Sequence, residues 1–503
     1  MNKPELDNKV LIKSYFKEKG FVDFDLESFN NFIDNELQQI IEENKEVEPT
    51  IVPPNVDEFK IRLDKIWVEK PQIIEADGSR REIFPVEARL RNLTYDAPIL
   101  LEVSSHINGI QRESFKIQIG KLPIMLRSKN CNLYGLTREK MIEQGEDPDD
   151  PGGYFIINGS EKTIIKVEDL APNRLLITKE KLGVSKYVGK VFSEAGSYKI
   201  PHVFEKLKDG IFYLTFTRVK RVPVIAIIKA LGLLKDEEIM KAIDLGEDTN
   251  VFINLFECVD LKTKEDTLDY IAKKIGISQS KEIRIERTND ILNKYLFPNL
   301  GIGEEKALFK AENICKMLKK FILVSSGAIE TDDKDHYMNK RLKLSSDSLA
   351  DLLRVNIKVL IGDMLYNFQR IVKRGKFPSI RVIIREKLLT QRIQSAMATG
   401  NWIGGRKGVS QRIERLNFIQ TISHLQRVVS PLSSSQENFA ARALHCTHLG
   451  RICTSETPEG SNIGLRKNLA LLCTVSQGSD QKEIVEKLIE LGLEKNKNLS
   501  LWG

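Results

Sequence analysis

Residues 444–465 read LHCTHLGRICTSETPEGSNIGL, and the interpretation of the whole chain starts from this stretch. It combines two histidines, one arginine, two acids, three glycines and one proline, without the period of a helix or a strand. Such a segment is a loop supported by other elements, and loops of this kind often form functional surfaces. Arg451, and Arg466 just beyond the stretch, are permanent cations, and backbone amides beside glycines can approach a ligand closely. The stretch indicates a loop that contacts phosphate; an ordinary, well-packed loop is the alternative.

The residues before this loop are basic. Residues 399–446 carry Arg406, Lys407, Arg412, Arg415, Arg427 and Arg442, opposed by Glu414 and Glu437. A run of charge is usually a solvated face, but basic side chains next to Gly404, Gly405 and Gly408 shift the interpretation toward phosphate binding. The chain contains no G-x-x-x-x-G-K-[ST] motif, so this is not a Walker loop.

Length and composition set the class of protein. A chain of 503 residues allows roughly three domains. Hydrophobic residues make up 41% and charged residues 29%, which is enough for packed cores and argues against disorder. The net charge of +7 is compatible with a nucleic-acid partner without identifying one.

Cysteine spacing and apolar stretches bear on the compartment. None of the six cysteines forms a C-x-x-C pair, which argues against a zinc ribbon. His445, Cys446, His448 and Cys453 cluster, but their spacing fits no common metal site. The N-terminal MNKPELDNKV has no apolar core, and the apolar stretch 222–234 is too short to span a bilayer. We expect a soluble, cytoplasmic protein.

Periodicity predicts an α+β multidomain protein in which helical segments are mixed with antiparallel sheets. Expected helices lie near 11–19, from about Ser28, at 223–231, at 236–243, at 349–372 and after 480. Expected strands lie between 51 and 119, at 154–168 around a turn at 158–160, on both sides of Asp209-Gly210, and at 469–475. The apolar stripe at 349–372 is interpreted as core, with Gly375 ending that helix.

Four motifs, in this order along the chain, resemble the second-largest subunit of multisubunit DNA-directed RNA polymerases. They are GKLPIMLRS at 120–128, GGYFIINGSEK at 152–162, DDKDHYMNKR at 332–341, and the run from GGRKGVSQ at 404–411 through SHLQRVVSP at 423–431 to Leu465. The family pattern HxTHxGRxCPxETPEGxNxGL matches at fourteen positions, from His445 to Leu465. The departures are Cys446, Leu449, Thr454 and Ser461.

The resemblance implies a domain layout. Residues 1–172 would form the N-terminal part of the protrusion, 173–331 the lobe, 332–400 the lobe closure and the return to the protrusion, 401–476 the fork with its loops, and 477–503 a C-terminal tail. The tail would contact the other half of the subunit, because split genes in methanogenic archaea produce an N-terminal half of this kind.

The resemblance also implies site residues and partners. The neighbours of nucleic acid or of the active centre that it implies are Arg406, Lys407, Gln411, Arg412, His424, Arg427, Arg442, His445, Arg451, Glu456 and Asn462. Catalytic Mg²⁺ would lie on aspartates of the largest subunit, so no catalytic residue and no cofactor are expected on this chain. The implied partners are template and non-template DNA, the DNA–RNA hybrid, the C-terminal half, the largest and other polymerase subunits, and transcription factors.

Two further interpretations remain open. The chain could be a free-standing nucleic-acid-binding or assembly protein derived from a polymerase subunit. It could also be a piece of an undivided subunit, although its initial methionine and expected C-terminal helix argue against this. We expect the arginines 427, 442 and 451 to have few acidic neighbours and to face an external anion, and Glu456 to orient an arginine or a backbone amide.

Overall fold

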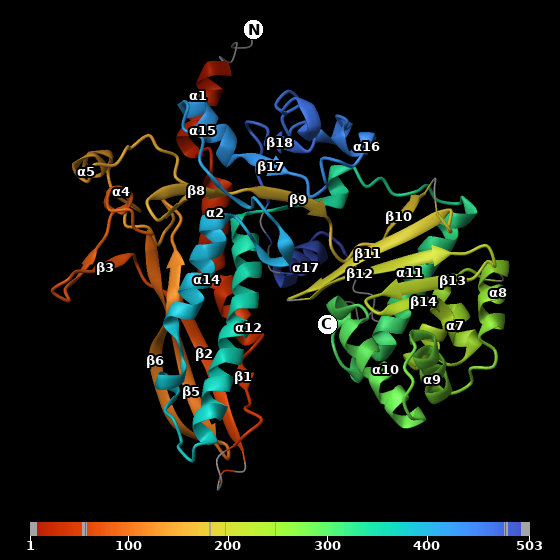
Figure 1. The fold of residues 1–503 in the computed structure, drawn as a ribbon. Coiled ribbons are helices and arrows are strands. Elements are labelled where there is room, and N and C mark those ends of the chain that lie inside the picture. The colour runs from red at the N-terminus through yellow and green to blue at the C-terminus, as the bar shows by residue number, and fades with distance from the viewer. Residues whose placement is uncertain are drawn as a thin grey trace.

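The computed structural model describes residues 8–493, apart from 53–55, 57, 181–182, 197, 247, 477 and 479–480. Within this part, the chain forms two bodies (Figure 1), and each has its own hydrophobic core. The first core joins residues 22–164 to residues 349–425, and the second is formed by residues 175–324. The chain therefore leaves the first body, builds the second and returns. The prediction of an α+β multidomain protein is confirmed.

The first body pairs an antiparallel sheet with long helices. Its sheet has the order β1–β2–β5–β6, with β1 at Glu46–Val47, β2 at Phe59–Val68, β5 at Asp96–Ile107 and β6 at Ile110–Pro123. Its main helices are α1 (Asn8–Glu18), α2 (Asp23–Asn31), α3 (Leu37–Glu42), α12 (Ser345–Val372) and α14 (Glu386–Thr399), and Phe32–Glu36 forms a π-helical turn between α2 and α3. The predicted apolar stripe of α12 is core: Leu349, Leu353 and Phe368 are buried.

The second body is a five-stranded antiparallel meander packed with helices. Its strands are β10 (Leu176–Lys179), β11 (Tyr187–Ala195), β12 (Tyr198–Lys206), β13 (Phe212–Phe216) and β14 (Val219–Pro223), in this spatial order. Its helices are α6 (Val224–Ala230), α7 (Asp236–Ile243), α8 (Thr249–Glu257), α9 (Lys264–Ile275), α10 (Lys281–Tyr295) and α11 (Ala307–Ser326). The predicted turn at Asp209-Gly210 and the predicted helix at 236–243 are confirmed.

A third sheet joins the two bodies. Its order is β15–β9–β17–β18, with β15 at Lys340–Lys343, β9 at Lys166–Leu170, β17 at Arg427–Val429 and β18 at Arg466–Asn468. We call it the joining sheet. Strand β9 pairs antiparallel with β15 and parallel with β17. Beside it, β16 (Ser410–Arg412) extends the predicted hairpin of β7 (Phe155–Ile157) and β8 (Ser160–Ile164).

Two element predictions are wrong. Helix α2 begins at Asp23 rather than near Ser28, because Asp23 and Asp25 occupy its first turn, where acids favour a helix start. The predicted strand at 469–475 is absent: Leu469 makes one isolated bridge to Ile452, and the amide of Cys473 then donates to the Ala470 carbonyl in a turn.

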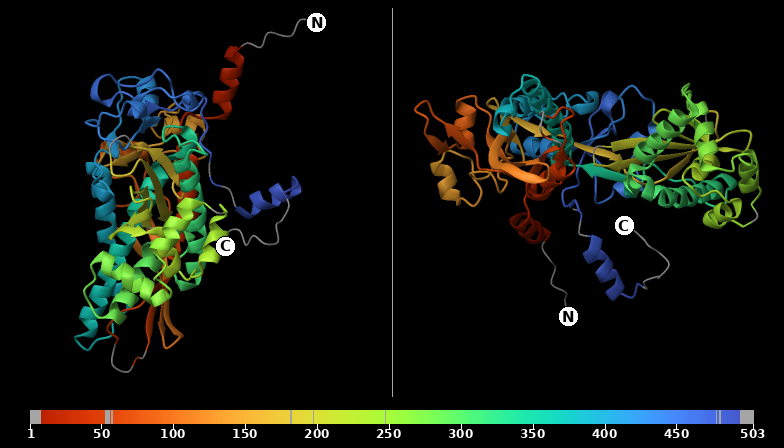
Figure 2. Two further views of the ribbon diagram at one scale, coloured as in Figure 1. Left: turned by 90° about the vertical axis from the view of Figure 1, so that its right-hand side faces the viewer. Right: turned by 90° about the horizontal axis from the view of Figure 1, so that it is seen from below.

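The C-terminal helix α17 (Gln481–Glu490) stands apart from both bodies (Figure 2). Its apolar residues Ile484, Val485, Leu488 and the following Leu491 are exposed. The predicted tail residues 494–503 and the N-terminal residues 1–7 lie outside the described part of the chain. None of the described helices is both long enough and apolar enough to cross a membrane.

Candidate nucleic-acid interface

The loop at 444–465 is held at both ends by the joining sheet. It leaves β17 through α16 (Phe439–Arg442), passes the short 3-10 turns Cys446–His448 and Gly460–Asn462, and returns as β18. The bridge between Ile452 and Leu469 fastens its middle. The prediction of a non-periodic loop supported by other elements is confirmed.

Arg442 fastens this loop from inside. One guanidinium nitrogen donates to the carbonyls of Ser461 and Ile463 at 2.7 and 3.1 Å, and the other donates to those of Ser434 and Gln436 at 2.9 and 3.2 Å. Arg442 has no acidic partner among the described residues, as expected, but these four carbonyls occupy its donors, so they are not free for an external anion. Carbonyl oxygens satisfy its donors, and a count of neighbouring acids does not register them.

The close approach at Arg442 explains one glycine of the motif. Gly464 has φ +70°, and a Cβ added there would lie 2.2 Å from the carbonyl oxygen of Arg442. Glycine is required at this position for backbone conformation and for space.

The other predicted cations differ in whether acids or carbonyls of the chain already bind their side chains. Arg427 is largely buried and lies 3.4 Å from the Glu414 carboxylate, so it is not unpaired as expected. Arg406 lies 3.7 Å from Asp351. Arg451 is exposed, and one of its guanidinium nitrogens donates a hydrogen bond to the Thr447 carbonyl at 3.2 Å.

Lys407 and Arg412 are also exposed. Neither forms an ion pair or a side-chain hydrogen bond with another residue in the described part of the chain. Lys407, Arg412 and Arg451 are thus the predicted site residues that keep most of their capacity for an external anion.

His424 and Gln411 support the surface from beneath. The Nδ1 atom of buried His424 accepts from the Glu414 amide at 3.1 Å, so Nε2 is the protonated nitrogen and donates to the Gln411 Oε1 at 3.3 Å. The side-chain amide nitrogen of Gln411 in turn donates to the Gly408 carbonyl. Burial, and secondarily Arg427, lower the pKa of His424 to about 4, so the ring is neutral at neutral pH.

His445 ties the loop to the segment before β15. Its Nδ1 accepts from the Thr447 amide at 3.2 Å, and its Nε2 lies 2.9 Å from the Asp333 carboxylate. His448 is buried with its ring edge-to-face on Tyr337, at a centroid distance of 4.8 Å. Burial lowers the pKa of His448 to about 4.

Glu456 and Asn462 complete the predicted set. Glu456 accepts from the hydroxyl of Ser423 on α15 (Phe418–Leu425), which corrects the expectation that it orients an arginine or an amide. Ser423 is held in turn by Asn468, whose amide donates to its carbonyl and hydroxyl. Asn462 is half-buried in the second 3-10 turn.

Two short acidic segments, one with Asp23 and Asp25 and one with Asp332, Asp333 and Asp335, do not form a metal site in the described part of the chain. The Asp332 carboxylate accepts hydrogen bonds from Lys320 and from the Ile177 backbone amide, while the Asp333 carboxylate lies against His445. The two carboxylates therefore have separate partners. Asp25 is buried against Lys166. Among the residues that the structure describes, no three His, Cys, Asp or Glu side chains gather as metal ligands, and this includes the region of Cys446 and Cys453.

A buried charge network on β9 was not predicted from the sequence. The Lys166 ammonium lies 2.9 Å from Asp25 and donates to the Leu425 carbonyl at 2.7 Å. The Glu168 carboxylate accepts from Lys467 at 2.9 and 3.1 Å, and from the Tyr337 hydroxyl. The available signal was the alternation of charged residues within the apolar stretch TIIKVEDL, which places Lys166 and Glu168 on one face of the strand.

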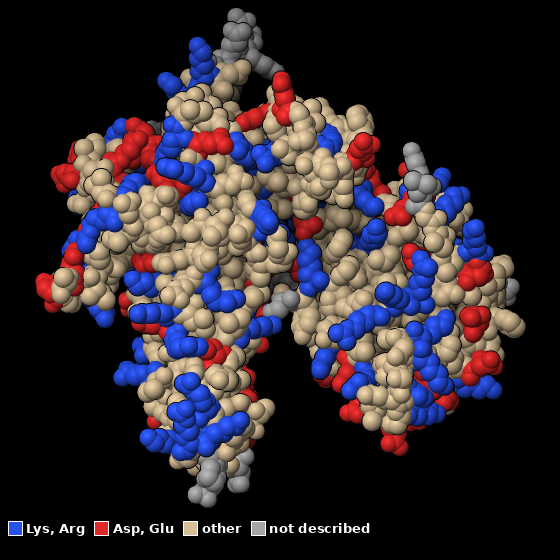
Figure 3. Space-filling model, viewed as in Figure 1, with Lys and Arg blue, Asp and Glu red and all other residues tan. Residues whose placement is uncertain are grey.

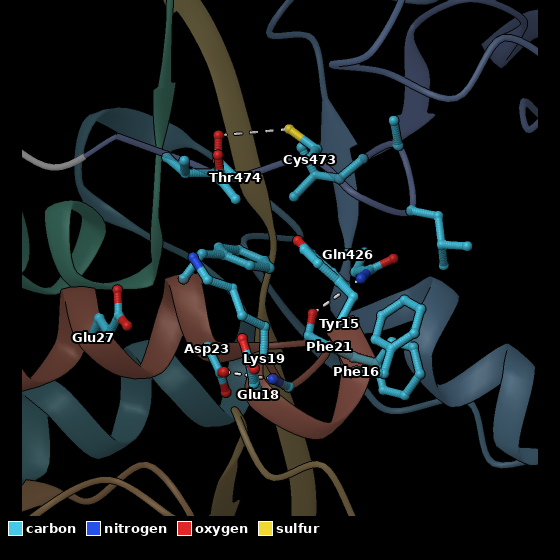
Figure 4. A pocket seen from close by; sticks show the side chains of 16 residues that line it. Tyr15, Phe16, Glu18, Lys19, Phe21, Asp23, Glu27, Gln426, Cys473 and Thr474 are labelled. Carbon is cyan, nitrogen blue, oxygen red and sulfur yellow. Dashed lines mark hydrogen bonds between the residues drawn. The ribbon is translucent and has the colours of Figure 1, made fainter. Parts of the chain in front are cut away.

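A small pocket of about 130 Å³ opens where α1 meets the segment after β18 (Figure 4). The rings of Phe16 and Phe21 stack at 4.6 Å, and the Gln426 amide donates to the Phe21 carbonyl at 3.0 Å. Leu471, which lines the pocket, and its neighbour Leu472 are more than half exposed. This side of the loop region presents apolar side chains, whereas the Lys407–Arg412 side presents cations.

Comparisons with known proteins match nearly the whole chain. The family model described as RNA polymerase beta subunit matches residues 20–391, and the model described as RNA polymerase Rpb2, domain 3, matches residues 411–475. DNA-directed RNA polymerase subunit Rpo2 of Saccharolobus solfataricus is 43% identical over 96% of this chain and 43% of its own length. The chain thus spans less than half of that relative.

Two further relatives are matched along almost their full length. DNA-directed RNA polymerase subunit Rpo2N of Methanocaldococcus jannaschii is 42% identical over 96% of this chain and 99% of its own length. The subunit Rpo2N of Methanococcus vannielii is 42% identical over 98% of this chain and 100% of its own length.

Proposed function

Because this chain belongs to the RNA polymerase beta subunit family, we propose that it is the N-terminal, B-double-prime part of the second-largest subunit of an archaeal DNA-directed RNA polymerase. The observation that carries the proposal is the 42% identity to Rpo2N subunits over nearly the whole of both chains. In this role the chain is an obligate part of a cytoplasmic nucleotidyltransferase and is inactive alone.

We assign residues 1–172 and 332–400, which make up most of the first body, to the protrusion with the closure of the lobe, and residues 173–331, which contain the second body, to the lobe. Residues 401–476 form the fork, and 477–503 the tail. A hollow separates the two bodies, and Lys and Arg side chains lie on both of its sides (Figure 3). Cations on both sides of the hollow could neutralise the phosphates of a DNA duplex. This supports the proposal that the chain forms one side of a DNA cleft.

The fork would lie near the active centre without carrying the catalytic metal. Mg²⁺ in such an enzyme neutralises phosphates and activates the attacking oxygen. Asp25, Asp332 and Asp333 are bound to partners within the chain, so we assign the metal to the largest subunit. Lys407, Arg412 and Arg451 would contact nucleic acid directly, while His424, Gln411, Arg442 and Glu456 would hold the surface in place.

Exposed apolar side chains around the fork support obligate assembly. Those that are at least half exposed are Leu416, Phe418, Ile419, Phe439, Leu444, Leu449, Leu471 and Leu472. An apolar surface of this kind marks an interface in a soluble protein. We assign it, together with the uncovered face of α17, to the C-terminal half of the subunit and to the largest subunit; DNA, the DNA–RNA hybrid, further subunits and transcription factors complete the set of partners.

Affinity capture of the tagged chain from its native source tests the proposal. We expect the other polymerase polypeptides to co-purify, and template-dependent RNA synthesis to appear in the captured complex but not with the chain alone. Recombinant chain should aggregate, and the complementary half should keep it in solution. A monodisperse chain recovered without polymerase polypeptides would instead favour the free-standing nucleic-acid-binding or assembly protein.

A further inference from the structure

A pocket of about 730 Å³ opens on the second body, away from the fork loop. Its walls are the turn between β13 and β14, the end of α9 and one face of α10. Arg287, Ile291 and Lys294 recur at helical spacing, so they line the same side of α10. The volume is that of a site for a small ligand or an inserted side chain.

The floor of this pocket is apolar. Ile275 and Ile277 flank the end of α9, Ile291 lies on α10, and all three are half-buried. Tyr295, 37% exposed, also lines the pocket. A floor of aliphatic side chains and one ring gains from contact with another apolar group, because that contact removes apolar surface from water.

The rim of the pocket is cationic. Arg218, Arg287 and Lys294 are exposed, and Asp290 is the acid that lies among them. None of these three cations has an ion pair or a hydrogen bond with the side chain of another residue that the structure describes. They differ in this from Arg284 on the same helix, which is bound to Asp269 at 2.6 Å. The three cations of the rim are therefore available to pair with an external anionic group.

The turn that presents Arg218 has an unusual backbone. Thr217, which precedes it, has φ +44°. A β-branched residue rarely adopts this conformation and keeps it only where the surrounding structure imposes it. Here the turn between β13 and β14 places Arg218 in the lining of the pocket, together with residues of α10.

We propose that this pocket binds an acidic segment of another protein, which inserts one bulky apolar side chain onto the isoleucine floor while its carboxylates pair with the arginine and lysine rim. Charge complementarity sets the acidic character of the segment, and the floor sets its apolar anchor. A nucleic-acid backbone would satisfy the cations but would leave the floor uncovered. The proposal goes beyond the assignment to a polymerase and does not depend on catalysis.

Fluorescence anisotropy on the full chain, held in its complex with the complementary half, tests the proposal. The probe is a short labelled peptide of Asp and Glu that carries one Phe and one Leu. Two further probes are a peptide of the same charge with Ser in place of Phe and Leu, and a single-stranded oligonucleotide. The test variant is Arg218→Glu/Arg287→Glu, and the matched control is Lys220→Glu/Lys241→Glu, which reverses two exposed charges outside the pocket lining.

The apolar acidic peptide should bind at least tenfold more tightly than the serine peptide. The Arg218→Glu/Arg287→Glu variant should weaken its binding at least tenfold, and the control should change it less than twofold. Ile291→Ala should weaken the apolar peptide and leave binding of the serine peptide unchanged. Equal binding of both peptides, tighter binding of the oligonucleotide that is lost in the same variant, or no measurable binding of the apolar peptide would each overturn the proposal.

Discussion

The Lys166 ammonium lies 2.9 Å from the Asp25 carboxylate, and the exposed fractions of the two side chains are 1% and 0%. The pair connects β9 to α2, and Ser345 at the start of α12 donates to the same carboxylate at 2.7 Å. Three segments far apart in the sequence thus meet at one buried charge pair.

Lys166→Ala should destabilise the first body by about 3–5 kcal/mol, because it leaves the Asp25 carboxylate buried without a cation. Thermal unfolding followed by circular dichroism would measure this loss as a lower midpoint. The control is Lys129→Ala, whose exposed pair with Asp34 should contribute less than about 1 kcal/mol. Equal midpoints for the two variants would show that the buried pair does not hold the segments together.

Arg442→Ala should loosen the fork loop rather than only remove a charge. Without its four contacts to carbonyls, the segments at 434–436 and 461–463 lose their common fastening. We expect faster limited proteolysis within 430–465. Arg442→Lys should restore little, because an ammonium lacks the planar fork that spans two pairs of carbonyls. Wild-type protease resistance of Arg442→Ala would refute this role.

Arg451→Ala should behave in the opposite way. Its side chain is exposed and makes one contact with a carbonyl, so folding and proteolysis should be unchanged. In the assembled enzyme, binding of nucleic acid should weaken, and the defect should shrink as salt rises. Affinity measured across a salt series checks this, and wild-type affinity at every salt concentration would mark Arg451 as a solvated residue only.

Gly464→Ala should disturb the fork loop more than Gly460→Ala. Both glycines have positive φ, at +70° and +85°, but an added Cβ meets the Arg442 backbone at position 464 and nothing within 4 Å at position 460. The Gly460 variant should lose about 1 kcal/mol from backbone strain alone. Hydrogen exchange of the loop amides would separate the two, and equal exchange rates would contradict the steric argument.

Mild acid should destabilise the protein through its buried histidines. Burial lowers the pKa of His202 and of His424 to about 4, below the ordinary value of 6.5. Between these values the unfolded chain binds more protons than the folded one, so the stabilisation is complete above about pH 6.5 and is lost as the pH falls toward 4. Thermal midpoints between about pH 7.5 and 4.5 measure this decline.

His424→Gln should make that decline shallower, since glutamine does not titrate. His202 stacks on Phe297 at 4.0 Å and lies in the other body, so His202→Gln should flatten the decline separately. A pH dependence identical to that of the wild type in both variants would show that other groups cause the acid lability.

The sequence predicted elements whose signals are local. The helix at 236–243 and the stripe of α12 follow from apolar spacing alone. The strand expected at 469–475 failed because an apolar run does not reveal the turn at Ala470 that ends pairing. The occupied state of Arg442 was hidden for a different reason: its partners are carbonyls up to 21 residues away, which no pattern of side chains records.

The joining sheet sets an order of events while the chain is made. Strand β9 carries Lys166 and Glu168 long before the joining sheet is complete. Asp25, the ion-pair partner of Lys166, precedes it in the chain, but the Leu425 carbonyl follows 259 residues later, and the Lys467 ammonium that pairs with Glu168 follows 299 residues later. Until β15 is made, this strand is an unpaired edge and Glu168 has neither Lys340 nor Lys467 beside it. Pairings of such long sequence separation form slowly, so the nascent chain should need protection by chaperones until β18 has left the ribosome.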